Sequence, residues 1–88
     1  MSDYQVQIKN SAKSDLKKIK RSNLKESFYA VVDQLKQNPF EPNQGFEKLE
    51  PPIAKKYSRR INVQHRVVYT VDKVNKVVSI YSAWSHYE

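Results

Sequence analysis

The apolar positions of this chain follow two different periods, and each period predicts a different kind of element. Residues 4–8 alternate between apolar and polar side chains, which is typical of a strand with one buried face. Two segments with helical spacing follow, and their apolar positions are Ala12, Leu16 and Ile19, then Leu24, Phe28, Val31, Val32 and Leu35. Asn10 or Ser11 is expected to cap the first helix, and Pro39 ends the second. The pattern predicts a strand followed by a helical hairpin.

The second half of the chain reads as a loop followed by strands. Residues 38–55 hold all four prolines and the single glycine, Gly45, so we expect a loop longer than usual, with Phe46 and Leu49 as apolar anchors. Segments rich in Val, Ile, Tyr and Thr predict antiparallel strands at 56–61, 66–72 and 76–81. Residues 82–88 are expected to continue the last strand in an extended conformation.

This order of elements, β-α-α-β-β-β, predicts a single α+β domain over residues 1–88. The helical hairpin is expected to pack on one face of a small, mainly antiparallel sheet. Because the hairpin covers only that face, polar side chains on the other face are expected to point at solvent or at a ligand.

The chain is strongly basic, with sixteen Lys and Arg against nine Asp and Glu and a formal net charge of +7. The cations concentrate in a basic segment, residues 9–25, in which Asp15 is the only acid. Such a segment attracts polyanions, although solubility alone is the alternative explanation. The lack of cysteine excludes disulfides and thiolate metal sites, and no apolar run has the length of a membrane span or signal peptide. We therefore expect a cytoplasmic protein without membrane contact.

Two arginines of the second and third predicted strands are candidates for binding phosphate, because a guanidinium donates paired hydrogen bonds and stays charged. A turn of odd length at residues 62–64 would place Arg60 and Arg66 on the same face, whereas an even turn would separate them. We predict the odd register. The alternative is that each of these two arginines merely solvates its strand; alternation places the neighbouring Arg59 on the other side of the strand from Arg60.

If the chain cleaves RNA, its titratable residues favour a reaction without a metal ion or other cofactor, although a glutamate in a loop and a histidine near the C-terminus are each more often ordinary than catalytic. Two histidines without clustered carboxylates cannot form a two-metal site. Scission would then use the 2′-hydroxyl of the RNA, which requires a base, a cation and an acid, and Glu47, Arg66 and His86 can fill these roles. Tyr57 and Tyr87 lie near cationic residues or histidine and could stack on bases. Tyr69 and Tyr81 are expected to serve ordinary packing.

Three segments resemble the YoeB (Txe) family of toxin-antitoxin endoribonucleases, part of the RelE superfamily. They are FEKLE at 46–50, YSRRINVQHRVVYTV at 57–71 and SAWSHYE at 82–88. The resemblance implies a RelE-like fold, in agreement with the order of elements above. It also implies a ribosome-dependent endoribonuclease that cleaves messenger RNA in the ribosomal A site and thereby inhibits translation.

The resemblance also implies roles for individual residues. It places the catalytic glutamate at Glu47, the transition-state arginine at Arg66, and the C-terminal histidine and tyrosine at His86 and Tyr87. The residues expected to contact RNA are Arg59, Arg60, Lys48, Lys56 and Tyr57. The sequence departs from the family at Glu50, where well-known members carry a basic residue; Lys48 and Lys56 are the candidates to replace it. A further residue, Glu88, follows the His-Tyr pair.

The partners implied by the resemblance are the bacterial ribosome with its messenger RNA, a second copy of the chain, and an acidic antitoxin of the YefM/Axe kind. Operator DNA would be bound only through the complex with the antitoxin. Two other functions remain open. One is a non-catalytic RNA- or ribosome-binding module that blocks translation by occupancy. A DNA-binding repressor is less favoured, because no recognition helix follows the basic helix.

Overall fold

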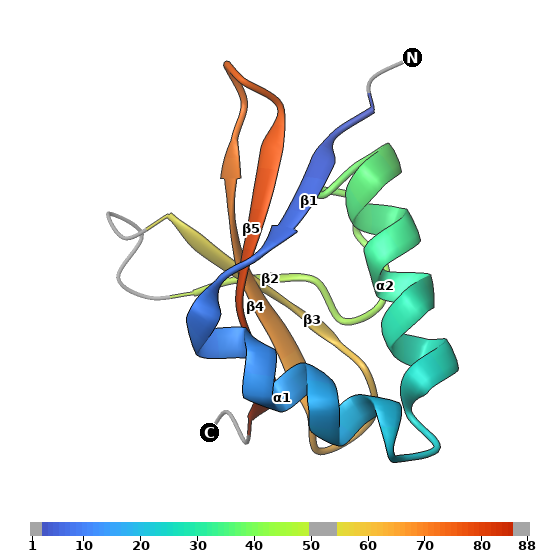
Figure 1. Cartoon of the computed structure of the whole chain (residues 1–88). Helices are drawn as coiled ribbons and strands as arrows, with labels where there is room; N and C mark the ends of the chain where they lie inside the picture. Colours follow the sequence, from blue (N-terminus) through green and yellow to red (C-terminus); the bar gives the residue numbers. More distant parts are fainter. Residues whose placement is uncertain (1–2, 50–54, 86–88) are drawn as a thin grey trace.

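A computed structural model describes residues 3–49 and 55–85, which form two helices and a five-stranded sheet (Figure 1). In chain order the elements are β1 (Gln5–Ile8), α1 (Asn10–Lys20), α2 (Lys25–Gln37), β2 (Glu47–Lys48), β3 (Lys56–Arg60), β4 (Arg66–Asp72) and β5 (Val77–Ser85). The strand order across the sheet is β1-β5-β4-β3-β2, with β1 parallel to β5 and the other neighbours antiparallel. The predicted α+β class is confirmed. No helix in the described ranges is long and apolar enough to cross a membrane.

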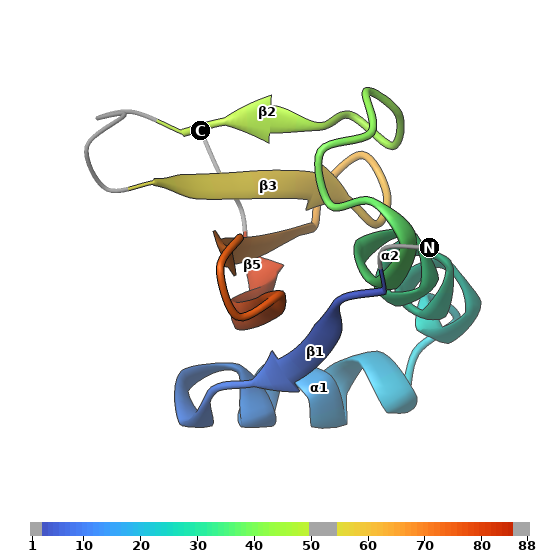
Figure 2. The same cartoon turned by 90° about the horizontal axis from the view of Figure 1, so that it is seen from above.

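Both helices turn their apolar sides to the same face of the sheet, as their spacing predicts. The buried helical residues are Ala12 and Ile19 of α1 and Phe28, Val31 and Leu35 of α2. They share one core cluster with Val67 and Tyr69 of β4 and with Val78 and Ile80 of β5. Figure 2 shows α1 beside the β1 edge of the sheet and β2 at the opposite edge. Residues that alternate with Val67 and Tyr69 therefore point to a face that neither helix covers.

The start of α1 differs from the expected cap. The helix begins at Asn10 with Lys9 as the N-cap residue, and among the described residues no side chain caps its first turn. Ser11 instead donates its hydroxyl to the backbone oxygen of Tyr81 at 2.7 Å. The predicted capping role is wrong because this hydroxyl has a partner on β5.

The segment expected as a loop at 38–55 contains the short strand β2, which corrects that prediction. Glu47 of β2 lies opposite Ser58 of β3, and the Leu49 nitrogen donates to the Lys56 oxygen at 2.9 Å. A strand of two residues is too short to show an alternating pattern, so hydrophobic periodicity could not reveal it.

The turn between β3 and β4 has the predicted odd register. The Ile61 nitrogen donates to the His65 oxygen at 2.9 Å, and this bond closes a turn over residues 62–64. Arg60 therefore lies directly opposite Arg66 in the antiparallel pair. Directly opposed residues point to the same face of a sheet, so the prediction that the two arginines share a face is confirmed.

Candidate active site

Two side chains with predicted catalytic roles meet on the face of the sheet that neither α1 nor α2 covers. Oε1 of Glu47 on β2 lies 3.5 Å from Nη1 of Arg66 on β4. Between them runs β3, whose buried Ser58 is opposite Glu47. The Glu47 side chain is 50% exposed and that of Arg66 is 15% exposed. The carboxylate is thus accessible, while the guanidinium is held close to the sheet.

Arg60 brings a second cation to this pair. It lies opposite Arg66 and is exposed. Its stem passes Gly45 so closely that a Cβ on that glycine would lie 2.8 Å from Cδ of Arg60. Gly45 also has a φ of 65°, a conformation that glycine adopts without steric cost. From the sequence, Gly45 only indicated a loop. Its close contact with Arg60 could not be predicted, because local sequence patterns do not show which distant segments lie side by side.

Lys56 lies on the same face as Arg60 and Arg66. It precedes Ser58 by two residues on β3, so both side chains point to the same side of the strand. Its Nζ lies 5.6 Å from the centroid of the Tyr81 ring, a distance at which an ammonium group is attracted to the ring. Lys56, Arg60 and Arg66 make this face suited to a phosphate backbone.

Lys48 and Tyr57 are not brought together with Glu47 and Arg66. They oppose each other in the β2–β3 pair and occupy the alternate positions, which point to the side of the helices. The ring of Tyr57 is half-buried in an aromatic cluster, with centroids 5.4 Å from Phe40, 5.8 Å from Phe46 and 5.9 Å from Tyr69.

Arg59 is buried on the helix side, which corrects the expectation that it contacts RNA. Its exposed fraction is 0%, and its guanidinium lies over the Phe46 ring at 5.0 Å. The oxygens that accept its hydrogen bonds are those of the Tyr69 hydroxyl at 3.0 Å, the Asn43 backbone at 3.1 Å and side chain at 2.7 Å, the Gln44 side chain at 3.4 Å, the Asn38 backbone at 3.5 Å and the Glu41 backbone at 2.8 Å. In this position the guanidinium holds a loop and cannot reach RNA.

Tyr69 links Arg59 to the core, and the packing role predicted for it is confirmed. Its hydroxyl accepts from Arg59 and donates to the backbone oxygen of Pro39 at 2.7 Å. Burial raises the pKa of Tyr69 to about 12, although the nearby Arg59 charge acts in the opposite direction. The phenol is therefore neutral at physiological pH and can serve as both donor and acceptor.

The predicted catalytic residues His86 and Tyr87, like Glu50 and Glu88, lie outside the described residues. The strand that precedes His86 is nevertheless fixed beside the site, because Ser85 pairs with Arg66. The Trp84 ring stacks on His65 with a centroid distance of 4.1 Å and an interplanar angle of 22°. The end of β5 is thus anchored to the turn that leads into Arg66.

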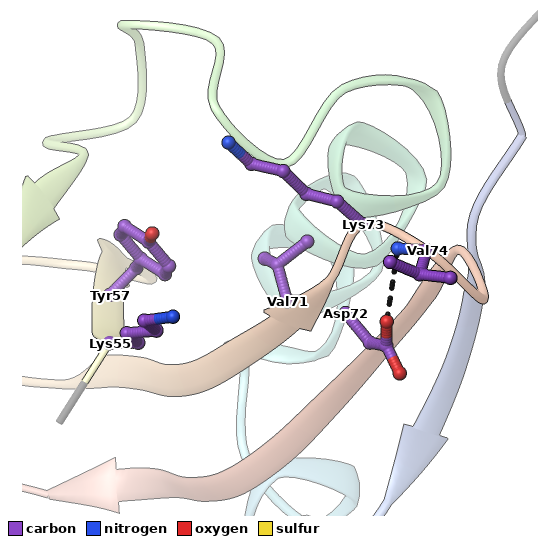
Figure 3. A pocket seen from close by; sticks show the side chains of 6 residues that line it. All are labelled: Lys55, Tyr57, Val71, Asp72, Lys73 and Val74. Carbon is purple, nitrogen blue, oxygen red and sulfur yellow. Dashed lines mark hydrogen bonds between the residues drawn. The ribbon is translucent and has the colours of Figure 1, made fainter.

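A hollow of about 480 Å³ lies on the other side of the sheet and does not belong to this site (Figure 3). It is lined by Lys55, Tyr57, Val71, Asp72, Lys73 and Val74. Hydrogen bonds, first from the Asn75 side chain, hold the pKa of Asp72 below its usual range, so this carboxylate is committed to the β4–β5 turn. Within 3–49 and 55–85, no three His, Cys, Asp or Glu residues are grouped so that they could hold a metal ion.

Comparison with solved structures identifies the class of fold. A YoeB/ParE toxin from Agrobacterium tumefaciens superposes with a TM-score of 0.83 and 25% identity, covering 94% of this chain and 99% of that chain. A YoeB dimer from Staphylococcus aureus gives 0.82 and 28%, covering 97% and 99%. A YoeB-YefM complex from the same organism gives 0.78 and 30%, covering 96% and 98%. No curated protein matches the chain.

The helical pair on a mixed five-stranded sheet is therefore the RelE-like toxin fold, as predicted. The family model that describes the YoeB-like toxin of bacterial type II toxin-antitoxin systems matches residues 3–87. The chain belongs to this family of YoeB-like toxins, which confirms the resemblance found in its sequence.

Proposed function

We propose that this protein is a ribosome-dependent endoribonuclease that cuts messenger RNA without a metal ion. The observation that carries the proposal is the 3.5 Å approach of Glu47 to Arg66 on an exposed face, with Arg60 opposite Arg66. A carboxylate and a guanidinium at this separation can act on the ribose and the phosphate of the same nucleotide.

The reaction proposed is an attack within the RNA chain. Glu47 removes the proton of a 2′-hydroxyl, and the oxygen attacks the adjacent phosphorus while the bond to the 5′-oxygen breaks. Arg66 neutralises the five-coordinate phosphorane, and His86 protonates the leaving 5′-oxygen. The products are a 2′,3′-cyclic phosphate and a 5′-hydroxyl. Tyr87 is assigned to the same site through the resemblance to the family.

The RNA contacts proposed follow from the faces of the strands. Arg60 and Lys56 share the face of Glu47 and can bind phosphates on either side of the cut. Lys48 and Tyr57 belong to the other side of the β2–β3 edge, so any contact they make is with RNA that passes around this edge.

The partners proposed are a second copy of the chain, an acidic antitoxin and the ribosome. The S. aureus relatives include a YoeB dimer and a heterotetrameric YoeB-YefM complex. A net charge of +7 suits an acidic peptide that becomes ordered on binding and covers the exposed cations. Operator DNA would be bound only through that complex.

The test is cleavage of messenger RNA on programmed ribosomes by the wild-type protein and by Glu47→Gln and Arg66→Ala. Each variant should keep its fold and lose about two to four orders of magnitude in rate, because it lacks the base or the transition-state cation. Mapping of the cut ends by primer extension gives the rate and the position. Glu26→Gln, an exposed carboxylate on α2, is the matched control and should cut normally.

Replacement of the nucleotide on the 5′ side of the cut by its 2′-deoxy form should abolish cleavage. Cutting that persists would rule out the 2′-hydroxyl as nucleophile. Intact messenger beside arrested translation would instead support the non-catalytic module that acts by occupancy.

A further inference from the structure

Arg59 carries a permanent charge in a fully buried position. The hydrogen bonds that it donates to described residues end on neutral oxygens of backbone, amide and phenol groups. Burying a cation without a carboxylate partner is costly, and an apolar side chain of similar volume would fill the space at a lower penalty. We therefore infer that Arg59 fixes the position of the groups it binds and does not merely fill space in the core.

Apart from the Tyr69 hydroxyl, the acceptors of the guanidinium lie in one segment, residues 38–46, which we call the 38–46 loop. This loop connects α2 to β2 and ends directly before Glu47. The acceptors of Nη1 and Nη2 lie along it from Asn38 to Gln44. Nε binds the Tyr69 hydroxyl, which in turn holds the Pro39 oxygen. Arg59 thus ties both the beginning and the end of the loop to the sheet.

Other contacts hold the 38–46 loop as well: the Arg60 nitrogen donates to the Gln44 oxygen at 2.7 Å, and the Phe46 ring stacks on Tyr57. The pairing of β2 itself is sparse. The strand has two residues and lies at the edge of the sheet, so β3 is its only partner among the described strands. Just before it, Gln44 and Gly45 have φ values of 53° and 65°, and this conformation is unfavourable for glutamine. A short edge strand that follows a strained turn would move readily if the turn were not held.

We propose that Arg59 is a positioning residue whose buried guanidinium fixes the 38–46 loop and thereby keeps Glu47 within reach of Arg66. The effect passes through the backbone, because Arg59 and Glu47 point to opposite faces: the residue opposite Glu47 is Ser58, the neighbour of Arg59. This inference rests on the proposed function, in which Glu47 acts as the base.

The first test measures the position of β2 without reference to activity. Asn43→Ala removes the side-chain oxygen that lies 2.7 Å from Arg59, together with the bond that the Asn43 amide donates to the Gln34 side chain at 3.2 Å, and leaves the guanidinium in place. Gln34→Ala removes only the second of these bonds and separates the two effects. Amide hydrogen exchange by NMR should become about tenfold faster at Phe46 and Leu49, while the amide of Tyr69 in the core stays protected. Glu41→Ala changes a side chain of the same loop but keeps the carbonyl that Arg59 binds, so it is the matched control.

The second test asks whether the effect on cleavage passes through Glu47. Asn43→Ala should slow single-turnover cleavage about tenfold with unchanged affinity for RNA, since misplacement of a catalytic group lowers rate rather than binding. In a Glu47→Gln background the same substitution should cause no further loss. Arg59→Met should act in the same direction more strongly, and its thermal unfolding shows whether it is folded.

Equal slowing in both backgrounds, or unchanged exchange at Phe46 and Leu49, would overturn the positioning role. A wild-type protein that cuts while Asn43→Ala cuts equally fast would also overturn it and leave the proposed function intact. A wild-type protein that never cuts programmed messenger would end the proposed function, and this inference with it.

Discussion

At the scale of single residues, the adjacent arginines Arg59 and Arg60 have different surroundings and different roles. Alternation along β3 turns Arg59 toward the helices, where it binds carbonyl groups, and turns Arg60 toward the exposed face opposite Arg66. A shift of register by one residue would exchange these roles. The odd turn at residues 62–64 therefore decides which arginine lies on the exposed face beside Arg66.

The buried phenol of Tyr69 predicts how stability depends on alkaline pH. A tyrosine in the unfolded chain ionises near pH 10, whereas the pKa of Tyr69 in the folded protein is about 12. The stabilisation is complete below pH 10 and is lost as the pH rises toward 12, a change of about 2 to 3 kcal/mol. Urea unfolding between pH 9 and pH 12 measures it.

Tyr69→Phe should reduce the loss of unfolding free energy between pH 9 and pH 12, because phenylalanine has no proton to release. Tyr29→Phe, at an exposed position of α2, should keep the slope of the wild type. If both variants lose stability with the same slope as the wild type, Tyr69 is not the group responsible.

At the scale of elements, α1 supports the irregular part of β5. The register between β4 and β5 shifts twice near the end of β5, so some backbone groups there leave the ladder. Two residues of α1 supply partners: Ser11 donates to the Tyr81 oxygen, and Asp15 accepts from the Ala83 nitrogen at 3.2 Å. The helix thus holds the strand that leads to His86.

Asp15→Ala should destabilise the protein by about 1 to 3 kcal/mol, because the Ala83 amide, on a residue that is 1% exposed, would lose its acceptor. Asp15→Asn keeps an acceptor oxygen and should cost less. Urea unfolding at pH 7 measures both, with Asp33→Ala at an exposed position of α2 as the control. Equal stability of Asp15→Ala and Asp33→Ala would show that the contact contributes nothing.

The elements with several turns or alternations could be predicted from the sequence, and the two-residue strand β2 could not. Both helices and the β3–β4–β5 meander have enough apolar positions to show their period. β2 has two residues and no period, and the partner of Ser11 lies seventy residues along the chain. For the site, register placed Arg60 with Arg66, but the burial of Arg59 and the clearance at Gly45 depend on the path of the 38–46 loop, which local patterns do not specify.

At the scale of the whole molecule, the cations are distributed unevenly about the fold. Figure 1 shows α1 and the turn between β3 and β4 at the same end of the molecule and the β4–β5 turn at the opposite end, while Figure 2 shows α1 at the β1 edge of the sheet, away from the β3–β4 turn. Exposed cations of α1 such as Lys13 and Lys17 therefore lie toward the end that carries Arg60 and Arg66. Lysines at the opposite end carry the same charge but lie farther from Arg60 and Arg66.

This distribution predicts that the positions of the lysines, and not only the net charge of the protein, determine its affinity for RNA. The double variant Lys13→Gln with Lys17→Gln should weaken binding to single-stranded RNA and lower the slope of log K against log salt by about 1.4, as expected if both contact phosphates. The control variant Lys36→Gln with Lys73→Gln removes the same charge at the end of α2 and in the β4–β5 turn, so its slope should stay close to the wild type. Fluorescence anisotropy over a salt series separates the two. Equal slopes in both variants would mean that RNA senses only the total charge, and α1 would then have no part in the RNA-binding surface.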